Sequence, residues 1–388
     1  MKVSLTDICD FQGGTQPPKD EWIDQPAQGY VRMLQIRDFT QSDKNYIEYV
    51  KDTGKLKTCI EDDILIGRYG ASIGKILTGL AGAYNVAIVK TIPDEKVVSK
   101  KYLYWYLNSQ YFQRFISNVG SRAAQAGFNK NDLGAAQIPL VDKERQEEIC
   151  EVLEKANKLI SLRKQQLAKL DELIKARFVE MFGDSVANTK NFPSTTLETV
   201  MTVFPQNGLY KPQTDYVQDD TGIPILRIDA FYNGKVTNWN TLKRLICSET
   251  EIDRYLLKEN DIVINRVNSI EYLGKCAHIV GLKEKTVFES NMMRFHMDEK
   301  KVNAVYVTEV LCTEDIYRQI LRRAKKSVNQ ASINQEDVKS LEILVPPLSL
   351  QNQFAAFVER VDQQKQTVQQ SLEKLELMKK ALMQEYFG

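Results

Sequence analysis

An internal repeat of roughly 190 residues constrains the architecture of this chain more than any other feature. Five blocks recur in both halves in the same order, and the offset between matching blocks drifts by only a few residues from one block to the next, from 192 to 207. A tandem duplication explains such an order. The matched blocks are Leu5–Ile8 with Leu197–Val200, Leu34–Phe39 with Leu226–Phe231, Glu61–Arg68 with Glu259–Arg266, Gln125–Asn129 with Gln330–Asn334, and Gln137–Leu140 with Leu344–Pro347.

Each copy begins with a part of mixed secondary structure. Short β-rich runs such as Asp63–Ile66, Asn85–Val89 and Asp261–Asn265 are separated by Gly, Pro and Asn, which favour turns. A helical run follows in each copy, over residues 100–119 and 302–326. We therefore expect two similar mixed domains.

A long helix is predicted at the end of each copy, and both helices stop at a Phe-Gly pair. Apolar residues recur in alternating steps of four and three with charged residues between them, which is typical of a coiled-coil seam. The alternative is a pair of ordinary amphipathic helices, each packed on its own domain. The seams run Ile149, Leu153, Ala156, Ile160, Arg163, Leu167, Leu170, Ile174, Arg177 and Met181, and Phe354, Val358, Val361, Lys365, Val368, Leu372, Leu375, Lys379, Leu382 and Tyr386.

The linker between the copies is too short to return along such a helix. A helix of about 38 residues is roughly 55 Å long, whereas the linker Asp184–Thr196 reaches at most about 45 Å. The predicted fold is therefore α+β: two mixed domains separated by two long antiparallel coiled-coil helices. The expected boundaries are 1–142 for the first domain, 143–183 for its helix, 184–196 for the linker, 197–348 for the second domain and 349–388 for its helix.

Composition excludes several classes of protein. A formal net charge of +1 gives no global attraction to nucleic acid, so any DNA-binding face must come from local charge placement. The six cysteines are scattered without a CxxC pair, and only two histidines are present. We therefore expect reduced thiols in a cytoplasmic protein and no metal site. The start lacks the pattern of a signal peptide, and the apolar segment Ile76–Val89 is too short to span a bilayer.

No motif for independent catalysis is found. Gly70–Lys75 lacks the first Gly and the final Ser or Thr of a phosphate-binding loop, and no GxGxxG follows a strand. The string Val345-Pro346-Pro347-Leu348 lacks the amide and the aromatic ring of an adenine methyltransferase loop, and no catalytic triad is present. Asp62-Asp63 and Asp219-Asp220 are interpreted as turn or solvated residues. A duplicated chain of this kind suggests a ruler or an adaptor.

The shared blocks resemble those of the specificity subunits of type I restriction–modification systems. The openings Leu5–Pro17 and Phe204–Pro212 are similar to the start of a target-recognition domain, and Gln137–Ile149 and Leu344–Gln353 to the entry into the long helix. The resemblance covers the whole chain. One departure is the residue before the helix-entry Gln, where Arg145 and Asn352 replace Glu; we expect slightly different packing there.

The resemblance implies a non-catalytic subunit with two recognition domains, each of which binds one half of a split, asymmetric DNA site. The implied partners are double-stranded DNA, two methyltransferase subunits and restriction-motor subunits, without a membrane. S-adenosylmethionine and ATP with Mg²⁺ would bind those other subunits, and no cofactor would bind this chain. The helices would set the spacing and dock the methyltransferase subunits through Leu153, Ile160, Leu167, Ile174, Val361, Val368, Leu375 and Leu382.

Candidate DNA contacts are expected in loops at matching places of the two copies. Arg suits guanine, Asn and Gln suit adenine, and Lys and Arg suit phosphates. The alternatives are structural salt bridges for Arg68 and Arg266 and a strand-end turn for the loop near residue 35. The first set is Gln35, Arg37, Arg68, Tyr69 and Ser72, matched by Arg227, Asp229, Arg266, Asn268 and Ser269.

A second set follows the helical run of each copy, in loops that are small and polar and, in the second copy, strongly basic. Such a loop can approach a phosphate closely. The set comprises Arg122, Gln125, Asn129 and Lys130, matched by Arg322, Arg323, Lys325, Lys326, Asn329, Gln330 and Asn334. The aromatic residues over 102–112 have helical spacing and are expected to pack in the core.

Two other functional classes remain open. A non-catalytic coiled-coil scaffold could bind proteins through its globular ends, and the small net charge favours it. Salt-dependent DNA binding distinguishes the two classes, because only phosphate neutralisation gives a steep slope with salt. A fused methyltransferase–specificity chain is disfavoured by the missing cofactor-binding region.

Overall fold

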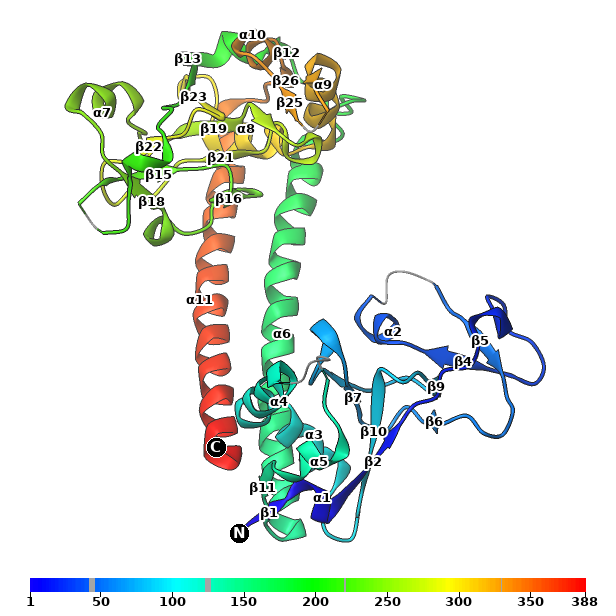
Figure 1. Ribbon diagram of the computed structural model, residues 1–388. Helices are drawn as coiled ribbons and strands as arrows, with labels where there is room; N and C mark the ends of the chain where they lie inside the picture. The colour runs from blue at the N-terminus through cyan, green and yellow to red at the C-terminus, as the bar shows by residue number, and fades with distance from the viewer. Residues whose placement is uncertain (42–45, 123–126, 220, 329) are drawn as a thin grey trace. The chain divides into compact units, whose positions relative to one another are not determined.

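The computed structural model describes residues 1–41, 46–122, 127–219, 221–328 and 330–388, which divide into two compact units (Figure 1). Unit 1 comprises 1–166 and 368–388, and unit 2 comprises 167–367. The division therefore cuts across both long helices, α6 (Lys143–Phe182) and α11 (Leu348–Phe387), and each unit contains a segment of each helix.

The mixed part of unit 1 contains a four-stranded antiparallel sheet, β2-β10-β7-β8, and a five-stranded sheet, β3-β5-β4-β9-β6. A two-stranded sheet, β1-β11, joins the start of the domain to the residues before α6. Its elements are β1 (Lys2–Ser4), α1 (Leu5–Ile8), β2 (Cys9–Gly13), η1 (Lys19–Glu21), β3 (Trp22–Ile23), β4 (Tyr30–Leu34), α2 (Ile36–Thr40), β5 (Tyr49–Lys51), β6 (Thr58–Cys59), β7 (Leu65–Gly67), η2 (Gly70–Ser72), β8 (Ile76–Leu77), β9 (Gly82–Tyr84), β10 (Ile88–Pro93), α3 (Lys100–Leu107), α4 (Gln110–Arg122), α5 (Lys130–Gly134) and β11 (Gln137–Pro139).

Unit 2 repeats this plan with a six-stranded sheet, β13-β23-β19-β21-β17-β16, and smaller sheets β14-β18-β15-β22, β20-β25-β24 and β12-β26. Its elements are β12 (Ser194–Thr196), η3 (Leu197–Val200), β13 (Met201–Asn207), η4 (Gln213–Asp215), β14 (Tyr216–Val217), β15 (Ile223–Leu226), β16 (Phe231–Tyr232), β17 (Gly234–Val236), η5 (Trp239–Thr241), β18 (Lys243–Leu245), α7 (Glu249–Tyr255), β19 (Asp261–Asn265), β20 (Val267–Asn268), η6 (Ile270–Tyr272), β21 (Cys276–His278), β22 (Val287–Phe288), β23 (Met292–Met297), α8 (Ala304–Leu311), α9 (Glu314–Arg323), β24 (Lys325–Lys326), β25 (Ala331–Ser332), α10 (Gln335–Lys339) and β26 (Glu342–Leu344).

The predicted helical runs are each divided into two helices. Residues 100–119 form α3 and α4, and residues 302–326 form α8 and α9 followed by β24. The breaks coincide with side chains that cap the next helix: the Ser109 hydroxyl accepts from the Phe112 amide at 3.2 Å, and the Thr313 hydroxyl accepts from the Ile316 amide at 3.4 Å. Local hydrogen bonding of Ser and Thr to the backbone favours such a helix start. The last three residues of the expected linker also differ, because they form β12 of the second domain.

The two long helices pack antiparallel within each unit. In unit 1, the Arg145 guanidinium lies 5.9 Å from the Tyr386 ring centre, and Lys164 pairs with Glu376 at 2.8 Å. In unit 2, Lys365 pairs with Asp171, and the rings of Phe178 and Phe354 lie 5.5 Å apart. Within each unit, residues with higher numbers in α6 therefore contact residues with lower numbers in α11, as expected for antiparallel helices.

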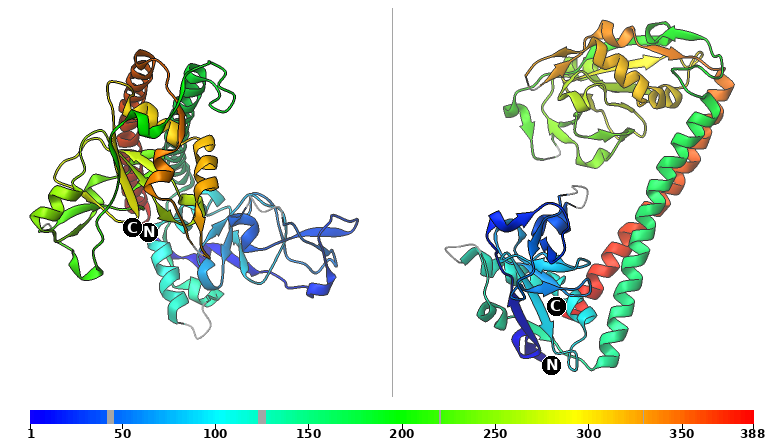
Figure 2. Two further views of the ribbon diagram at one scale, coloured as in Figure 1. Left: turned by 90° about the horizontal axis from the view of Figure 1, so that it is seen from above. Right: turned by 90° about the vertical axis from the view of Figure 1, so that its right-hand side faces the viewer.

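The hydrophobic core of each unit includes residues from both helices. In unit 1, Leu153 of α6 and Phe387 of α11 lie in the core with α3 and α4. In unit 2, Phe182 of α6 and Phe354 of α11 lie in the core with α8. The two termini meet in unit 1, where the Lys2 ammonium donates to the Gly388 carbonyl at 3.2 Å (Figure 2).

Candidate nucleic-acid interface

In unit 1, the two loops predicted to contact DNA lie against each other. Arg68 directly follows β7, and its Nε donates to the Phe128 carbonyl at 2.9 Å. Tyr69 forms an isolated antiparallel bridge with Gly127. The loop after β7 and the segment before α5 therefore make one surface feature, although about 60 residues separate them in the chain.

Unit 2 joins its two matching loops in the same way and more extensively. β20, which contains Asn268, pairs with β25, and β25 pairs with β24 to form a hairpin. The Ile333 amide donates to the Arg266 carbonyl at 2.9 Å. Both copies thus bring together segments that the sequence offered only as separate candidates.

The arginines that begin these loops have internal partners. Besides its bond to Phe128, the Arg68 guanidinium lies 5.0 Å from the Tyr69 ring centre. Arg266 donates through Nη1 to the Ser290 carbonyl at 3.2 Å. Both side chains are half-buried. They therefore hold the loop through backbone carbonyls, a structural role close to the salt bridges considered from the sequence.

The smaller residues of these loops shape the backbone. Ser72 ends η2, and its amide donates to the Tyr69 carbonyl at 3.3 Å. Asn268 accepts the Ser269 amide at 2.8 Å, and Ser269 precedes η6. Tyr69 is exposed.

A glycine in each loop packs closely against a helix, Gly74 against α4 and Gly274 against α9. Gly74 and Gly274 have φ of +75° and +77°, and a Cβ there would lie 2.5 Å from Ile116 and 2.3 Å from Ile320. Only glycine accommodates both constraints without strain. The Gly70–Lys75 segment thus owes its second glycine to helix packing.

The candidates near residues 35 and 227 are engaged with buried carboxylates. Gln35 donates to the Glu48 carboxylate at 2.6 Å, and Arg37 forms an ion pair with the same group, which is buried. Arg227 lies 3.7 Å from the Glu289 carboxylate and 3.9 Å from Asp229. Burial raises the pKa of Glu289. Asp229 itself is exposed.

The basic segment of unit 2 presents several exposed cations. Arg322, Lys325, Lys326 and Gln330 are exposed, and the Ser327 amide donates to the Gln330 carbonyl at 2.7 Å to close the hairpin. Within the described parts of the chain, the two lysine ammonium groups have no ion pair. Arg323 differs, because it donates to Ser340 and to the Gln319 carbonyl.

The matching segment of unit 1 is less basic. Lys130 is exposed and pairs with Asp10. Asn129 and Asn334 are helix caps that form capping boxes with Asp132 and Asp337 at the starts of α5 and α10. Gln125 and Asn329 lie outside the described residues, as does the side chain of Arg122, the last residue of α4.

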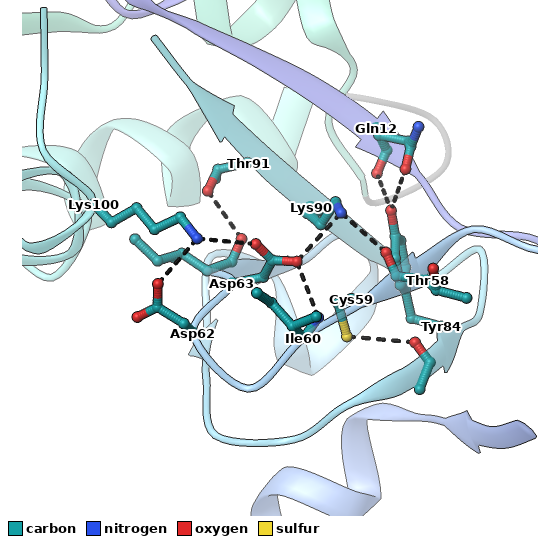
Figure 3. Close-up of polar contacts among 12 residues, drawn as sticks. Gln12, Thr58, Cys59, Ile60, Asp62, Asp63, Tyr84, Lys90, Thr91 and Lys100 are labelled. Carbon is teal, nitrogen blue, oxygen red and sulfur yellow. Dashed lines mark hydrogen bonds and ion pairs between the residues drawn. The ribbon is translucent and has the colours of Figure 1, made fainter. Parts of the chain in front are cut away.

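A half-buried ion cluster lies next to strand β7 in unit 1. Asp63 accepts from Lys90 at 3.2 Å and from the Ile60 amide at 3.1 Å, and Lys100 lies 3.4 Å from its other oxygen (Figure 3). Burial opposes ionisation, but these donors hold the pKa of Asp63 below its usual value. Asp62 pairs with Lys100 as well, so both acids have structural partners.

The same position in unit 2 is more deeply buried. Asp261 accepts from Arg294 at 3.1 Å and from His296 at 2.9 Å. The aromatic residues Tyr102, Trp105, Tyr106 and Phe112 are also buried, as expected from their helical spacing.

Comparison with known proteins decides the family. The model of the type I restriction modification DNA specificity domain matches residues 1–172 and again 192–377. The chain belongs to the type I restriction–modification specificity family. The double match also confirms the internal repeat.

The matches to three relatives cover different shares of this specificity subunit. It is 30% identical over 187 residues to a putative type I restriction enzyme MjaX specificity subunit of Methanocaldococcus jannaschii, a match that covers 47% of this chain and 42% of the relative. The MjaVIII specificity subunit of the same organism is 23% identical over 98% of this chain and 90% of its own length. The EcoKI specificity subunit of Escherichia coli K12 is 23% identical over 71% of this chain and 61% of its own length.

Solved structures confirm the fold. The S subunit of a type I restriction–modification system from M. genitalium aligns with a TM-score of 0.59 and 14% identity, over all of this chain and 96% of the other. A structure from work on complex assembly and conformational transition of the type I R-M system aligns with a TM-score of 0.55 and 14% identity, over all of this chain and 97% of the other. The α+β architecture with two domains and two long helices is thereby shown.

The heptad residues predicted to contact partner helices are covered by the subunit itself to a large extent. Leu153, Ile160, Ile174, Val361 and Val368 are buried, and Leu167, Leu375 and Leu382 are half-buried. The seam cations also have partners on the other helix, since Lys365 pairs with Asp171 and Lys379 donates to Asn157 at 2.7 Å. A partner would therefore contact other faces of these helices.

Two buried glutamines occupy equivalent positions at the helix entries of the two copies, and they correct the match expected from the sequence. Gln146 and Gln351 are fully buried at the starts of α6 and α11 and accept the amides of Ser99 and Asn303, each at 2.9 Å. They fix the long helix to the start of α3 or α8. Gln351, and not Gln353, is therefore the counterpart of Gln146, so Leu350 rather than Asn352 precedes the helix-entry Gln in the second copy.

Across the described ranges, no group of three or more His, Cys, Asp or Glu side chains could hold a metal ion. None of the helices that the structure describes is long and apolar enough to cross a membrane.

Proposed function

We propose that each mixed domain, 1–142 and 197–348, binds one half of a bipartite, asymmetric DNA site. The observation that carries the proposal is the duplicated loop pair, in which the segment after β7 or β19 is joined to the segment before α5 or α10. Duplicated scaffolds with different loop residues suit two different half-sites, because base contacts depend on the loop side chains.

We expect the two domains to differ in the number of phosphate contacts that they make with their half-sites. The loop pair of unit 2 carries Arg322, Lys325 and Lys326 in exposed positions, whereas Lys130 in unit 1 is paired with Asp10. Phosphate neutralisation by exposed cations raises affinity without sequence preference. We therefore propose that the second domain supplies more of the nonspecific affinity, and that Tyr69 is a contact of the first.

The helices α6 and α11 are proposed to set the spacing between the half-sites and to dock two methyltransferase subunits. Their antiparallel pairing in each unit supports a stiff spacer. In this proposal the chain is non-catalytic and cytoplasmic. S-adenosylmethionine binds the methyltransferase subunits, and ATP with Mg²⁺ binds the restriction-motor subunits.

DNA binding by the assembled methyltransferase tests the proposal. We expect log affinity to fall steeply with log salt between 50 and 200 mM, and we expect the double variant Lys325→Gln/Lys326→Gln to reduce the slope by about 2. The matched control is Lys283→Gln/Lys285→Gln, which removes two exposed charges from a different loop of the same domain and should change the slope by less than one. A salt-independent affinity would instead support a protein scaffold.

A further inference from the structure

Two cysteine thiols touch in unit 2. The Sγ atoms of Cys276 and Cys312 lie 3.6 Å apart. Cys276 belongs to β21 and is fully buried, whereas Cys312 follows the last residue of α8 and is exposed. All six cysteines lie within the described residues, and no other two of them come within hydrogen-bonding distance.

The pair lines an open pocket of about 290 Å³. Gly234, Lys275 and Tyr317 contribute to the lining. Gly234 has φ of +77°, and a Cβ at this position would lie 3.6 Å from the Cys312 sulfur and 3.0 Å from Thr308. The glycine therefore keeps the approach to the thiols open.

The first copy lacks this pair. Lys75 and Lys275 occupy the same place, since their carbonyls accept from the Gly67 and Asn265 amides, each at 2.8 Å. Ile76 therefore matches Cys276, and Asn108 matches Cys312 because each follows the last residue of its helix. The fold does not require two cysteines here, so their contact in unit 2 calls for a separate explanation.

We propose that Cys276 and Cys312 form a reversible modification site, at which oxidation by a hydroperoxide creates an intramolecular disulfide. The sulfurs need to approach by about 1.5 Å to reach bonding distance. The proposal rests on the thiol contact, the cavity and the exposure of one partner, and it is independent of DNA recognition.

The reaction has two steps, the first at the exposed Cys312 thiol and the second at the buried Cys276 thiol. The Cys312 thiolate attacks one peroxide oxygen and the O–O bond breaks, which leaves a sulfenic acid on Cys312 and releases hydroxide. The Cys276 sulfur then attacks the sulfenic sulfur, so that the S–S bond forms and the S–O bond breaks. The hydroxyl leaves as water with a proton. Two thiols are oxidised, and one hydrogen peroxide is reduced to two waters.

Burial assigns the order of the two steps. The Cys312 contact and burial both raise the pKa of Cys276, so this thiol is a poor first nucleophile. Its contact with Cys312 makes it an efficient second one, because the sulfenic sulfur forms beside it. The product would join the six-stranded sheet, through β21, to the end of α8.

Thiol counting and peptide mapping test the proposal on the full-length chain. After treatment with a small excess of hydrogen peroxide, we expect free thiols to fall from six to four and a peptide cross-linked between Cys276 and Cys312 to appear. Dithiothreitol should restore all six thiols. Cys312→Ser should abolish the cross-linked peptide, whereas Cys247→Ser, which removes a cysteine outside the pair, should leave it unchanged.

Two outcomes would overturn the proposal. One is Cys312 recovered as sulfinic acid or as an intermolecular disulfide while Cys276 stays reduced. The other is six free thiols after a peroxide dose that oxidises an exposed cysteine in a reference peptide. The double variant Ile76→Cys/Asn108→Cys tests the geometry separately, since transplanting the pair to unit 1 should allow two additional thiols to be lost.

Discussion

The ring of Phe387 lies 5.2 Å from the ring of Tyr102, although 285 positions separate the two residues in the sequence. The corresponding rings of Phe182 and Tyr306 lie 4.6 Å apart. Each Phe-Gly end thus packs on the domain of the other copy, Phe387 in unit 1 and Phe182 in unit 2. Neither structural unit coincides with one copy of the repeat.

Because Phe387 packs in unit 1, its truncation should destabilise the first domain rather than the second. Phe387→Ala should destabilise unit 1 by about 3–5 kcal/mol, because a fully buried aromatic ring is lost and a cavity remains. Hydrogen exchange should rise within residues 1–142 and change little within 197–348. Val179→Ala, at a largely exposed site, is the control and should leave exchange unchanged. Faster exchange confined to the second domain would contradict the assignment.

The buried glutamine at the start of α6 should contribute comparably to stability. Gln146 accepts from Ser99 and donates to Val97 and Val141, each at 2.9 Å. Gln146→Ala leaves these backbone groups unpaired, and we expect a loss of about 2–4 kcal/mol in urea unfolding. Gln165→Ala, at an exposed site of the same helix, should cost less than about 0.5 kcal/mol. Equal effects of the two variants would argue against the structural role.

The stability of unit 2 should decrease as the pH is lowered from 6.5 to about 4. Burial lowers the pKa of His278 from 6.5 to about 4. Below pH 6.5 the unfolded chain binds a proton that the folded chain does not bind until about pH 4, so stability is lost as pH falls between these values. The expected loss from pH 6.5 to 5 is about 1.5 kcal/mol. In urea unfolding, His278→Gln should remove this part of the pH dependence; an unchanged slope would be inconsistent with a buried neutral imidazole.

Much of the fold could be predicted from the sequence because its pattern is repeated. The 4-3 spacing identified both long helices, and block matching paired Arg68 with Arg266, which occupy equivalent places. Helical spacing also placed Tyr102 and Phe112 in the core. These features depend on local periodicity, which a single sequence displays.

The roles of individual site residues depend on contacts between distant segments. Arg37 is predicted to contact DNA, but it forms an ion pair with Glu48, which lies eleven residues further along the chain. Lys365 interrupts the apolar seam of α11, and Asp171 of the same chain supplies a carboxylate that pairs with it. Sequence spacing does not show such partners. Asn129 is different, since the capping box with Asp132 follows a recognisable local pattern.

The spacer hypothesis predicts the effect of a matched deletion. Removal of Lys164–Leu170 from α6 together with Gln366–Leu372 from α11 takes one heptad from each helix and keeps the seam in register. Seven residues correspond to about 10 Å, or roughly three base pairs. The same half-sites should then be modified with a spacer shorter by about that number. A different pair of half-sites, or an unchanged spacer, would show that the helices do not set the distance.

Methylome sequencing tests the central claim most directly. Cells that express this chain with its methyltransferase partner should carry N6-methyladenine in one asymmetric motif, composed of two different half-sites separated by a fixed number of unspecified bases. Cells that express the methyltransferase alone should lack it. A continuous motif, a symmetric one, or no new methylation in the presence of both proteins would contradict the proposal that each domain recognises one half of a bipartite site.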